Sequence, residues 1–422
     1  MNLQPRTSSR LWIRLLFLAL GYIAFILLGS PEGLRGVAWT PIQAEFKVTP
    51  DFLGVLLFPP TVGYLLSSFF SGRVTGLLGT GRALACAAAL MGMGLVGYGV
   101  APTWLAIVSI GFAIGFGGGI IDAGLNTFLA AHYHPSLLYL LHAFFGVGTT
   151  LSPLFITDIL RRGESWRLAY QLVGGAAFVL AVIFLLTSPL WNRFERQPAK
   201  TKADASAVPV ARTALFATLR LPMTWLGIVL FFIYAGVEGT VGAWAFSVFT
   251  AQGVSEVNAG AWLSTYWGTF TLGRVLSIGV AQVLSTTTLL RGAMISVIGG
   301  ALLFVWSPSP EVGLAGVVLI GLFTAPVFPA LIANTGDRVG NSHAPNAIGF
   351  QVAAAGLGLA VMPGLAGWLA VNTPGKFTSI SLSVLVVALL IYALYEWTLL
   401  LARRKGNAGE GVEDATSTSR ST

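Results

Sequence analysis

The sequence predicts an all-α polytopic membrane protein, with twelve transmembrane helices in two pseudo-symmetric six-helix bundles. Its composition is the first reason: 55% of the 422 residues are hydrophobic, 9% are charged, and the mean hydropathy is +0.79. An ordinary soluble domain has about 25% charged residues. Continuous apolar runs are the second reason, because the strands of an outer-membrane barrel alternate apolar and polar residues, unlike residues 173–186 and 391–401. The third reason is an internal repeat.

Breaks at glycine, proline and charge clusters divide the chain into twelve apolar segments, each long enough to cross a bilayer as a helix. The first six lie at about 15–40, 52–72, 83–101, 103–131, 139–160 and 168–190. The second six lie at about 223–249, 258–284, 289–306, 311–335, 345–371 and 376–401. We expect Pro326 and Pro329 to interrupt the tenth segment. The segments therefore predict an N-terminal bundle over 1–190 and a C-terminal bundle over 223–402.

The segments between and after the bundles are polar. Residues 191–222 combine Lys and Arg with small residues and two prolines, which is typical of a solvated tether on an anionic membrane face. We therefore expect a cytoplasmic linker there. Residues 403–422 turn to Gly, Ser, Thr and acidic residues, which cannot bury a core, so a disordered cytoplasmic tail is expected.

The net charge of +8 lies mostly in the loops that flank the apolar segments. It therefore indicates membrane topology and argues against a nucleic-acid partner. With both termini and the linker on one side, that side holds most of the Lys and Arg, and the positive-inside rule makes it cytoplasmic. We expect a multi-pass protein of a plasma membrane of the bacterial inner-membrane type.

Two short motifs occur once in each half. Gly-x-Gly-x4-Pro begins at Gly146 and again at Gly356, and Glu-Gly-x-x-Gly begins at Glu32 and again at Glu238. The two spacings nearly agree, although glycine is so common here that either match alone could arise by chance. Six helices duplicated in the same orientation form a parallel repeat, and in secondary transporters the substrate site lies near the bilayer midplane between such halves.

Several longer stretches resemble one family. They are Gly119-Ile-Ile-Asp122-Ala-Gly-Leu-Asn126, Leu141-His142-Ala-Phe-Phe-Gly146, Tyr234-x-Gly236-x-Glu238 through Trp244, and Tyr266-Trp267-Gly268 through Arg274. Together they resemble the fucose/galactose/glucose:proton symporter branch of the major facilitator superfamily and its sodium-dependent glucose transporter relatives. The resemblance implies a cavity lined by the first, fourth, seventh and tenth spans, and proton-coupled uptake of a hexose or deoxyhexose by alternating access.

Two positions depart from that family. Its loop between the second and third spans carries an acid and then a base after the leading glycine, whereas Gly76 and Leu77 follow Gly72 here. A gate that uses this salt bridge would be weakened, and we assign the gating role to Gly72 and Arg82 together with Arg274. The fucose permease also has an acid four residues before a helix-1 proline, where Val37 stands here, which leaves Glu32 as a substitute.

Five charged residues lie inside predicted spans: Glu32, Arg35, Asp122, Glu238 and Arg274. A charge at the bilayer centre costs about 2.5 to 3.5 kcal/mol on insertion scales, so it is usually kept to face a cavity or a partner. Asp122 is the first candidate for proton coupling, and a structural carboxylate is the alternative. Glu32 and Arg35 are one turn apart and can pair, either as a structural tie or with Arg35 contacting the substrate.

Glu238 is the repeat mate of Glu32 but has no basic residue one turn further on. It therefore needs a partner from another helix, such as Arg274, or a proton. We consider Glu238 and Glu32 further candidates for proton coupling, with a structural hydrogen bond as the alternative for Glu238. For Arg274, an interhelical tie or gate is favoured over ligand contact.

Polar and aromatic side chains complete the predicted substrate site, since pockets combine aromatic walls with a few polar groups. Apart from Arg35, these candidates are Asn126, Trp39, Trp244, Tyr266, Trp267, Gln351, Asn334 and His142. Each aromatic side chain has plain packing or anchoring at the membrane interface as its alternative role. For His142, a hydrogen bond between helices is the alternative to substrate contact.

The expected partners are a small-molecule substrate, the lipid bilayer, and H+ as coupling ion with Na+ as the alternative. We expect a monomer with no cofactor and no metal, and not an enzyme, because the four His and single Cys show no catalytic spacing and there is no P-loop. A proton-coupled efflux antiporter for drugs or amphipathic, lipid-like solutes is the competing function. Gly146-x-Gly-x4-Pro153 is similar to a motif of such antiporters, but Ser152 stands where they have glycine.

Overall fold

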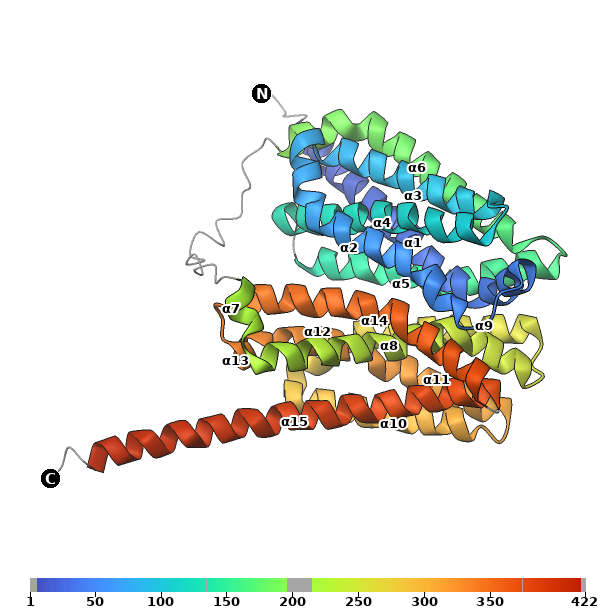
Figure 1. The fold of residues 1–422 in the computed structure, drawn as a ribbon. Helices are drawn as coiled ribbons and strands as arrows, with labels where there is room; N and C mark the ends of the chain where they lie inside the picture. Colours follow the sequence, from blue (N-terminus) through green and yellow to red (C-terminus); the bar gives the residue numbers. More distant parts are fainter. Residues whose placement is uncertain (1–5, 134, 196–214, 374, 419–422) are drawn as a thin grey trace.

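The structure is a computed structural model that describes residues 6–133, 135–195, 215–373 and 375–418. All regular secondary structure in these ranges is helical. Eleven of the described helical segments are long and apolar enough to cross a membrane. The helices run side by side in two groups, with α1–α6 in the upper half of Figure 1 and α8–α15 in the lower half. The predicted all-α membrane fold is confirmed.

The N-terminal half consists of six long helices. They are α1 (Arg6–Phe46), α2 (Phe52–Leu78), α3 (Thr80–Val100), α4 (Trp104–His132), α5 (Pro135–Arg161) and α6 (Trp166–Glu195). Within this half, α1 packs against α5, α2 against α4, and α3 against α6. Glu45 near the end of α1 accepts hydrogen bonds from Trp166 Nε1 at 2.8 Å and Arg167 Nη2 at 2.6 Å, which ties α1 to the start of α6.

The C-terminal half has more helices because one span is broken. It consists of α7 (Leu215–Leu219), α8 (Pro222–Ala251), α9 (Glu256–Val283), α10 (Thr286–Trp306), α11 (Pro310–Thr324), α12 (Val327–Ala333), α13 (Thr335–Val339), α14 (Ala344–Asn372) and α15 (Lys376–Thr418). The predicted eighth span is α9, a 28-residue helix that is too polar to be among the eleven. It packs against α5, α8 and α11.

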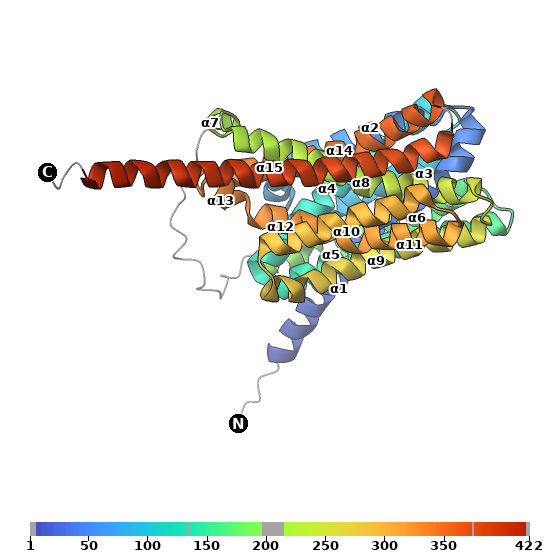
Figure 2. The same ribbon diagram turned by 90° about the horizontal axis from the view of Figure 1, so that it is seen from below.

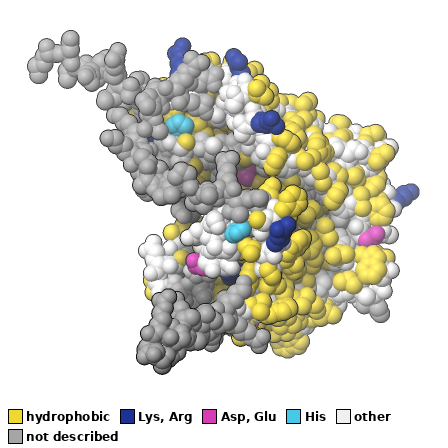
Figure 3. All heavy atoms as spheres, turned by 60° about the vertical axis from the view of Figure 1, so that its left-hand side comes forward, with side chains coloured by type: hydrophobic (Ala, Val, Ile, Leu, Met, Phe, Trp, Pro, Cys, Tyr) yellow, Lys and Arg dark blue, Asp and Glu magenta, His cyan; other side chains and the backbone are white. Residues whose placement is uncertain are grey.

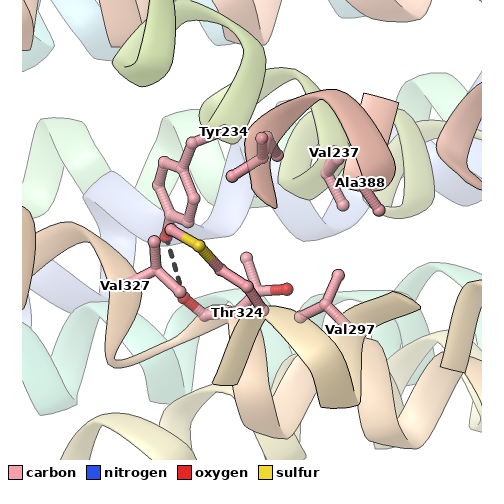
Figure 4. Close-up of a pocket in the computed structure, with 8 residues that line it drawn as sticks. Tyr234, Val237, Val297, Thr324, Val327 and Ala388 are labelled. Atoms are coloured by element: carbon pink, nitrogen blue, oxygen red, sulfur yellow. Dashed lines mark hydrogen bonds between the residues drawn. The ribbon is translucent and has the colours of Figure 1, made fainter. Parts of the chain in front are cut away.

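The tenth span breaks at Pro326, as its sequence predicts. Because proline lacks an N–H group, it cannot continue the helical hydrogen bonds, and α11 ends at Thr324. The Tyr234 hydroxyl of α8 donates to the Thr324 carbonyl oxygen at 3.1 Å. Figure 4 shows this bond beside a small, mostly apolar pocket lined by Val237 and Val297, among others. A tyrosine of α8 thus satisfies a carbonyl group at the break.

The segments outside the bundles differ from expectation at one place. Of the predicted linker over 191–222, residues 196–214 lie outside the described residues, and α6 reaches Glu195 before it. The predicted disordered tail over 403–422 needs correction, because α15 continues to Thr418 and projects from the bundle in Figures 1 and 2. Extending an existing helix costs much less than nucleating one, and the Ala, Arg and Glu residues here favour the extension despite the glycines.

The second glycine of each Gly-x-Gly motif packs within its own half. A Cβ atom at Gly148 in α5 would overlap the carbonyl group of Ile26 in α1. A Cβ atom at Gly358 in α14 would overlap the carbonyl group of Phe232 in α8 in the same way. Such close backbone approach is the usual role of small residues between membrane helices.

The first glycine of each motif faces the other half. Gly146 of α5 lies against Thr271 of α9, and Gly356 of α14 lies against Leu65 of α2. The duplicated motif therefore makes equivalent contacts twice, which is the arrangement that a parallel repeat predicts. The halves meet through the pairs α5–α9, α2–α14 and α1–α8.

The repeated Glu-Gly-x-x-Gly motif brings α1 and α8 together. A Cβ atom at Gly36 would overlap the carbonyl oxygen of Gly242, so a side chain would push the two helices apart. One turn further on, the hydroxyl oxygens of Thr40 and Ser247 lie 3.1 Å apart. We call the end of the molecule at Thr40 and Ser247 the closed end.

The halves separate toward the opposite end, which carries α7 and the start of α1. Gly54 of α2 lies against Gly364 of α14 near the closed end, and Gly72 lies five turns along the same face of α2. No described atom is within 4 Å of a Cβ position at Gly72 or at Gly349 of α14. Figure 3 turns this end toward the viewer and shows an indentation between the halves, with hydrophobic side chains along the flank. We call it the open end.

Candidate functional site

Asp122 of α4 is held by two neutral hydrogen-bond donors. The Tyr64 hydroxyl of α2 donates to Oδ2, and Asn126 Nδ2 donates to Oδ1 at 2.8 Å. Asn126 lies one turn after Asp122 on the same helix face, as the spacing predicts. Within the described chain, Asp122 forms no ion pair. A carboxyl group held in this way can exchange a proton without breaking an ion pair.

His142 extends the Asp122 cluster toward the C-terminal half. It lies on α5 one turn before Gly146, the glycine that faces α9, and its side chain is exposed. Its ring meets the Phe25 ring edge to face at 5.5 Å. His142 therefore lies on α5 near the contact between the halves.

Glu238 of α8 is the corresponding acid of the C-terminal half. The Tyr234 hydroxyl, one turn earlier, lies 3.2 Å from Glu238 Oε2 and shares its single proton between this oxygen and the Thr324 carbonyl oxygen. The Tyr266 hydroxyl of α9 donates to the Glu238 backbone carbonyl oxygen at 3.0 Å, which fixes α9 beside this point of α8. The ion pair with Arg274 that the sequence suggests does not form, and a tyrosine takes the place of that partner.

Arg274 of α9 is half-buried, and its guanidinium lies over the Phe270 ring, 4.4 Å from the centroid. The guanidinium makes no ion pair and no hydrogen bond with any residue in the described ranges. Arg274 therefore has hydrogen-bond donors available at the boundary between the halves, with only an aromatic ring as support.

Glu32 and Arg35 of α1 form the ion pair that their spacing allows. The pair is bidentate, with both nitrogen–oxygen distances at 2.9 Å. Arg35 also lines a pocket inside the N-terminal half together with Tyr98 and Tyr170. Glu32 thus has the intrahelical basic partner that its repeat mate Glu238 lacks.

The four predicted aromatic ligands are enclosed in packing contacts. Trp39 and Trp244 are 0% and 2% exposed, and their rings meet edge to face at 6.3 Å near the closed end. Trp244 Nε1 donates to the Pro363 carbonyl oxygen at 2.9 Å. Tyr266 and Trp267 of α9 are 0% and 4% exposed. In this conformation all four side chains support contacts between helices, which is the alternative role of each.

The remaining predicted residues lie apart from the ionisable groups. Gln351 is buried in the C-terminal half and accepts a hydrogen bond from Thr335 Oγ1 at 2.9 Å. Asn334 caps the end of α12 through its backbone. Gly72 and Arg82 are exposed near the open end, and Arg82 forms no ion pair with the part of the chain that the structure describes. Their gating role stays a prediction.

Sequence reasoning missed three aromatic residues that position the charged groups, namely Tyr64, Tyr234 and Phe270. Tyr234 precedes Glu238 by four residues, and Phe270 precedes Arg274 by four, so helical spacing could have found both. Tyr64 reaches Asp122 only because α2 packs against α4. No local pattern in the sequence signals that contact.

Known proteins support the same architecture. A sequence profile of the Major Facilitator Superfamily matches residues 21–314. The glucose/mannose transporter GlcP of Bacillus subtilis (strain 168) is 24% identical over 354 residues, which cover 82% of this chain and 86% of GlcP. The human sodium-dependent glucose transporter 1 is 23% identical over 418 residues, covering 88% of this chain and 78% of the transporter.

Solved structures share the fold at much lower sequence identity. A crystal structure of a mutant of the nucleoside transporter NupG superposes with a TM-score of 0.73 at 14% identity, covering 92% of this chain and 99% of that one. At this identity the likeness concerns the fold alone. Together with the profile match over more than half of the sequence, it confirms the predicted family: the chain belongs to the Major Facilitator Superfamily.

Proposed function

We propose that the protein is a secondary active transporter that takes up a hexose or deoxyhexose together with protons by alternating access. The observation that carries this proposal is the set of ionisable groups between the halves, with Asp122 on one side and Glu238 on the other. Two relatives are named as glucose transporters, which supports a sugar as the substrate. Carboxyl and guanidinium groups at this level can also bond the hydroxyl groups of such a solute.

Proton coupling requires a group that is reached from one side of the membrane at a time. Asp122 is held by Tyr64 and Asn126 and has no cationic partner among the described residues. By the positive-inside rule the open end faces the cytoplasm. In this conformation Asp122 can therefore release a proton to the cytoplasm, and it takes up the next proton from outside after the halves rock.

Proton-coupled efflux of drugs or of amphipathic, lipid-like solutes is the alternative. Its support is the Gly146-x-Gly-x4-Pro153 motif, yet both motif glycines have packing roles that recur in the other half. Ser152, which replaces the expected glycine, donates to the Gly148 carbonyl oxygen at 2.7 Å. These contacts explain the motif without an antiport mechanism, so we favour uptake.

Transport by purified protein in liposomes tests this proposal. We expect an inward proton gradient to drive accumulation of D-glucose, with L-glucose as the stereochemical control. A sodium gradient at constant pH should drive none, because H+ is the proposed coupling ion. Absence of D-glucose exchange in any gradient would contradict sugar transport. Export of an amphipathic cation under the same proton gradient would support the efflux alternative instead.

A further inference from the structure

We propose that Arg274 and Glu238 form a substrate subsite that binds adjacent hydroxyl groups of a neutral sugar and disfavours sugars that carry a charge. This inference rests on the proposed sugar transport and specifies which chemical class of sugar the protein accepts. In this proposal Arg274 contacts the ligand, whereas the sequence favours an interhelical tie or gate for this residue.

The two side chains reach the same level of the bundle. The Tyr266 hydroxyl meets the backbone of Glu238, so these two residues lie side by side on the antiparallel helices α8 and α9. Arg274 lies about 12 Å further along α9, at 1.5 Å per residue. Its guanidinium folds back over Phe270, one turn nearer to Tyr266. Glu238 contacts Tyr234, one turn toward the open end on α8, so the two charged groups converge.

The converging groups nevertheless remain unpaired. The Arg274 guanidinium has no ion pair or hydrogen bond within the described ranges, and the Glu238 carboxylate has a single side-chain donor at 3.2 Å. Opposite charges that are held apart in a region of low dielectric attract a ligand that can bridge them. Phe270 holds the guanidinium in place for such a ligand.

The hydroxyl group is the ligand chemistry that fits both partners. It can donate to a Glu238 oxygen and accept from an Arg274 nitrogen at the same time. The planar guanidinium also presents parallel N–H groups, which suit two neighbouring oxygen atoms. A pair of adjacent sugar hydroxyls therefore satisfies the arginine fork and one carboxylate oxygen together.

Charged sugars meet repulsion at the same place. A sugar acid would bring its carboxylate near Glu238, and an amino sugar would bring its ammonium group near Arg274. Like charges in close contact reduce affinity and so provide specificity by exclusion. The subsite thus selects neutral sugars, because Glu238 repels sugar acids and Arg274 repels amino sugars.

Binding to purified full-length protein tests the subsite. The ligands are D-glucose, D-glucuronate and protonated D-glucosamine, and the variants are Arg274→Gln and Glu238→Gln. The control variant is Arg162→Gln, which removes a guanidinium whose side chain is 69% exposed at the end of α5. We expect wild-type protein and the control to bind D-glucose at least about tenfold more tightly than either charged sugar, which corresponds to 1.4 kcal/mol.

The variants should change specificity in opposite directions. Both variants should weaken D-glucose binding about tenfold. In Glu238→Gln, the ratio of the affinity for D-glucose to that for D-glucuronate should fall. In Arg274→Gln, the ratio of the affinity for D-glucose to that for D-glucosamine should fall. If the two residues had a merely structural role, the variants would weaken the binding of all three ligands to the same extent, and that result would overturn the subsite. Unchanged D-glucose affinity in both variants would also overturn it. If the wild-type protein binds no sugar, the proposed function itself fails.

Discussion

The Asp122→Asn variant is expected to lose proton-driven accumulation of D-glucose completely while it retains exchange of D-glucose across the membrane. Asparagine has the same shape as aspartate and keeps an oxygen that can accept the hydrogen bond from Tyr64. It cannot bind a proton in the physiological range, so the sugar gradient can no longer draw on the proton gradient. In proteoliposomes, the ratio of internal to external D-glucose should fall to about 1.

A matched control makes this result specific. Asp158→Asn makes the same chemical change at the end of α5, where the carboxylate pairs with Arg161 at 2.8 Å and with Arg162 at 2.5 Å. These exposed pairs contribute little to stability, so accumulation should match the wild-type protein. Accumulation by Asp122→Asn at the wild-type level would reject Asp122 as the coupling group. Loss of exchange as well would point to a structural role.

The second large effect is expected for Gly36→Val at the crossing of α1 and α8. The new Cβ atom would overlap the carbonyl oxygen of Gly242, and a backbone group cannot rotate away. Overpacking of this kind costs about 1 to 3 kcal/mol, which shifts a two-state equilibrium by about 5- to 150-fold. The cost falls on conformations in which the closed end is sealed, so we expect uptake of D-glucose to fall at least tenfold.

Chemical labelling can show that the closed end has opened. Ser247 is 6% exposed there, and Cys86 is the only native cysteine, so Ser247→Cys in a Cys86→Ser background places a single thiol at the seal. We expect a membrane-impermeant maleimide to label this thiol faster when Gly36→Val is present. Gly175→Val on α6 is the control, since no described atom lies within 4 Å of its Cβ position. Equal labelling in both proteins would contradict the account.

The fold follows from the sequence because its determinants are local or repeated. Apolar length predicts helices, and the duplicated glycine motifs predict two equivalent halves, which the packing of Gly148 and Gly358 bears out. Pro326 predicts the broken span because the chemistry of proline acts within one turn. The tail is different, because its helix to Thr418 continues the span that precedes it. The composition of the tail alone does not show that a helix is already formed before it.

The candidate site is predictable only where its contacts lie within one helix. The Asn126 bond to Asp122 and the Glu32–Arg35 pair both follow from spacings of three or four residues. The partner of Asp122 from α2 and the unpaired state of Arg274 depend on how helices far apart in sequence pack together. The large aromatic residues expected to bind substrate pack between helices in this conformation, and their role as ligands stays a prediction, because the same side chains suit either role.

Distance measurements between labels at the two ends test the alternation of the halves most directly. One pair joins Gly76→Cys on α2 with Gly349→Cys on α14 at the open end, and the other joins Thr49→Cys with Gln252→Cys at the closed end, both in the Cys86→Ser background. With D-glucose at acidic pH, the account predicts that the first distance shortens while the second lengthens in the same population of molecules. Distances that change together, or that do not respond to sugar and protons, would contradict it.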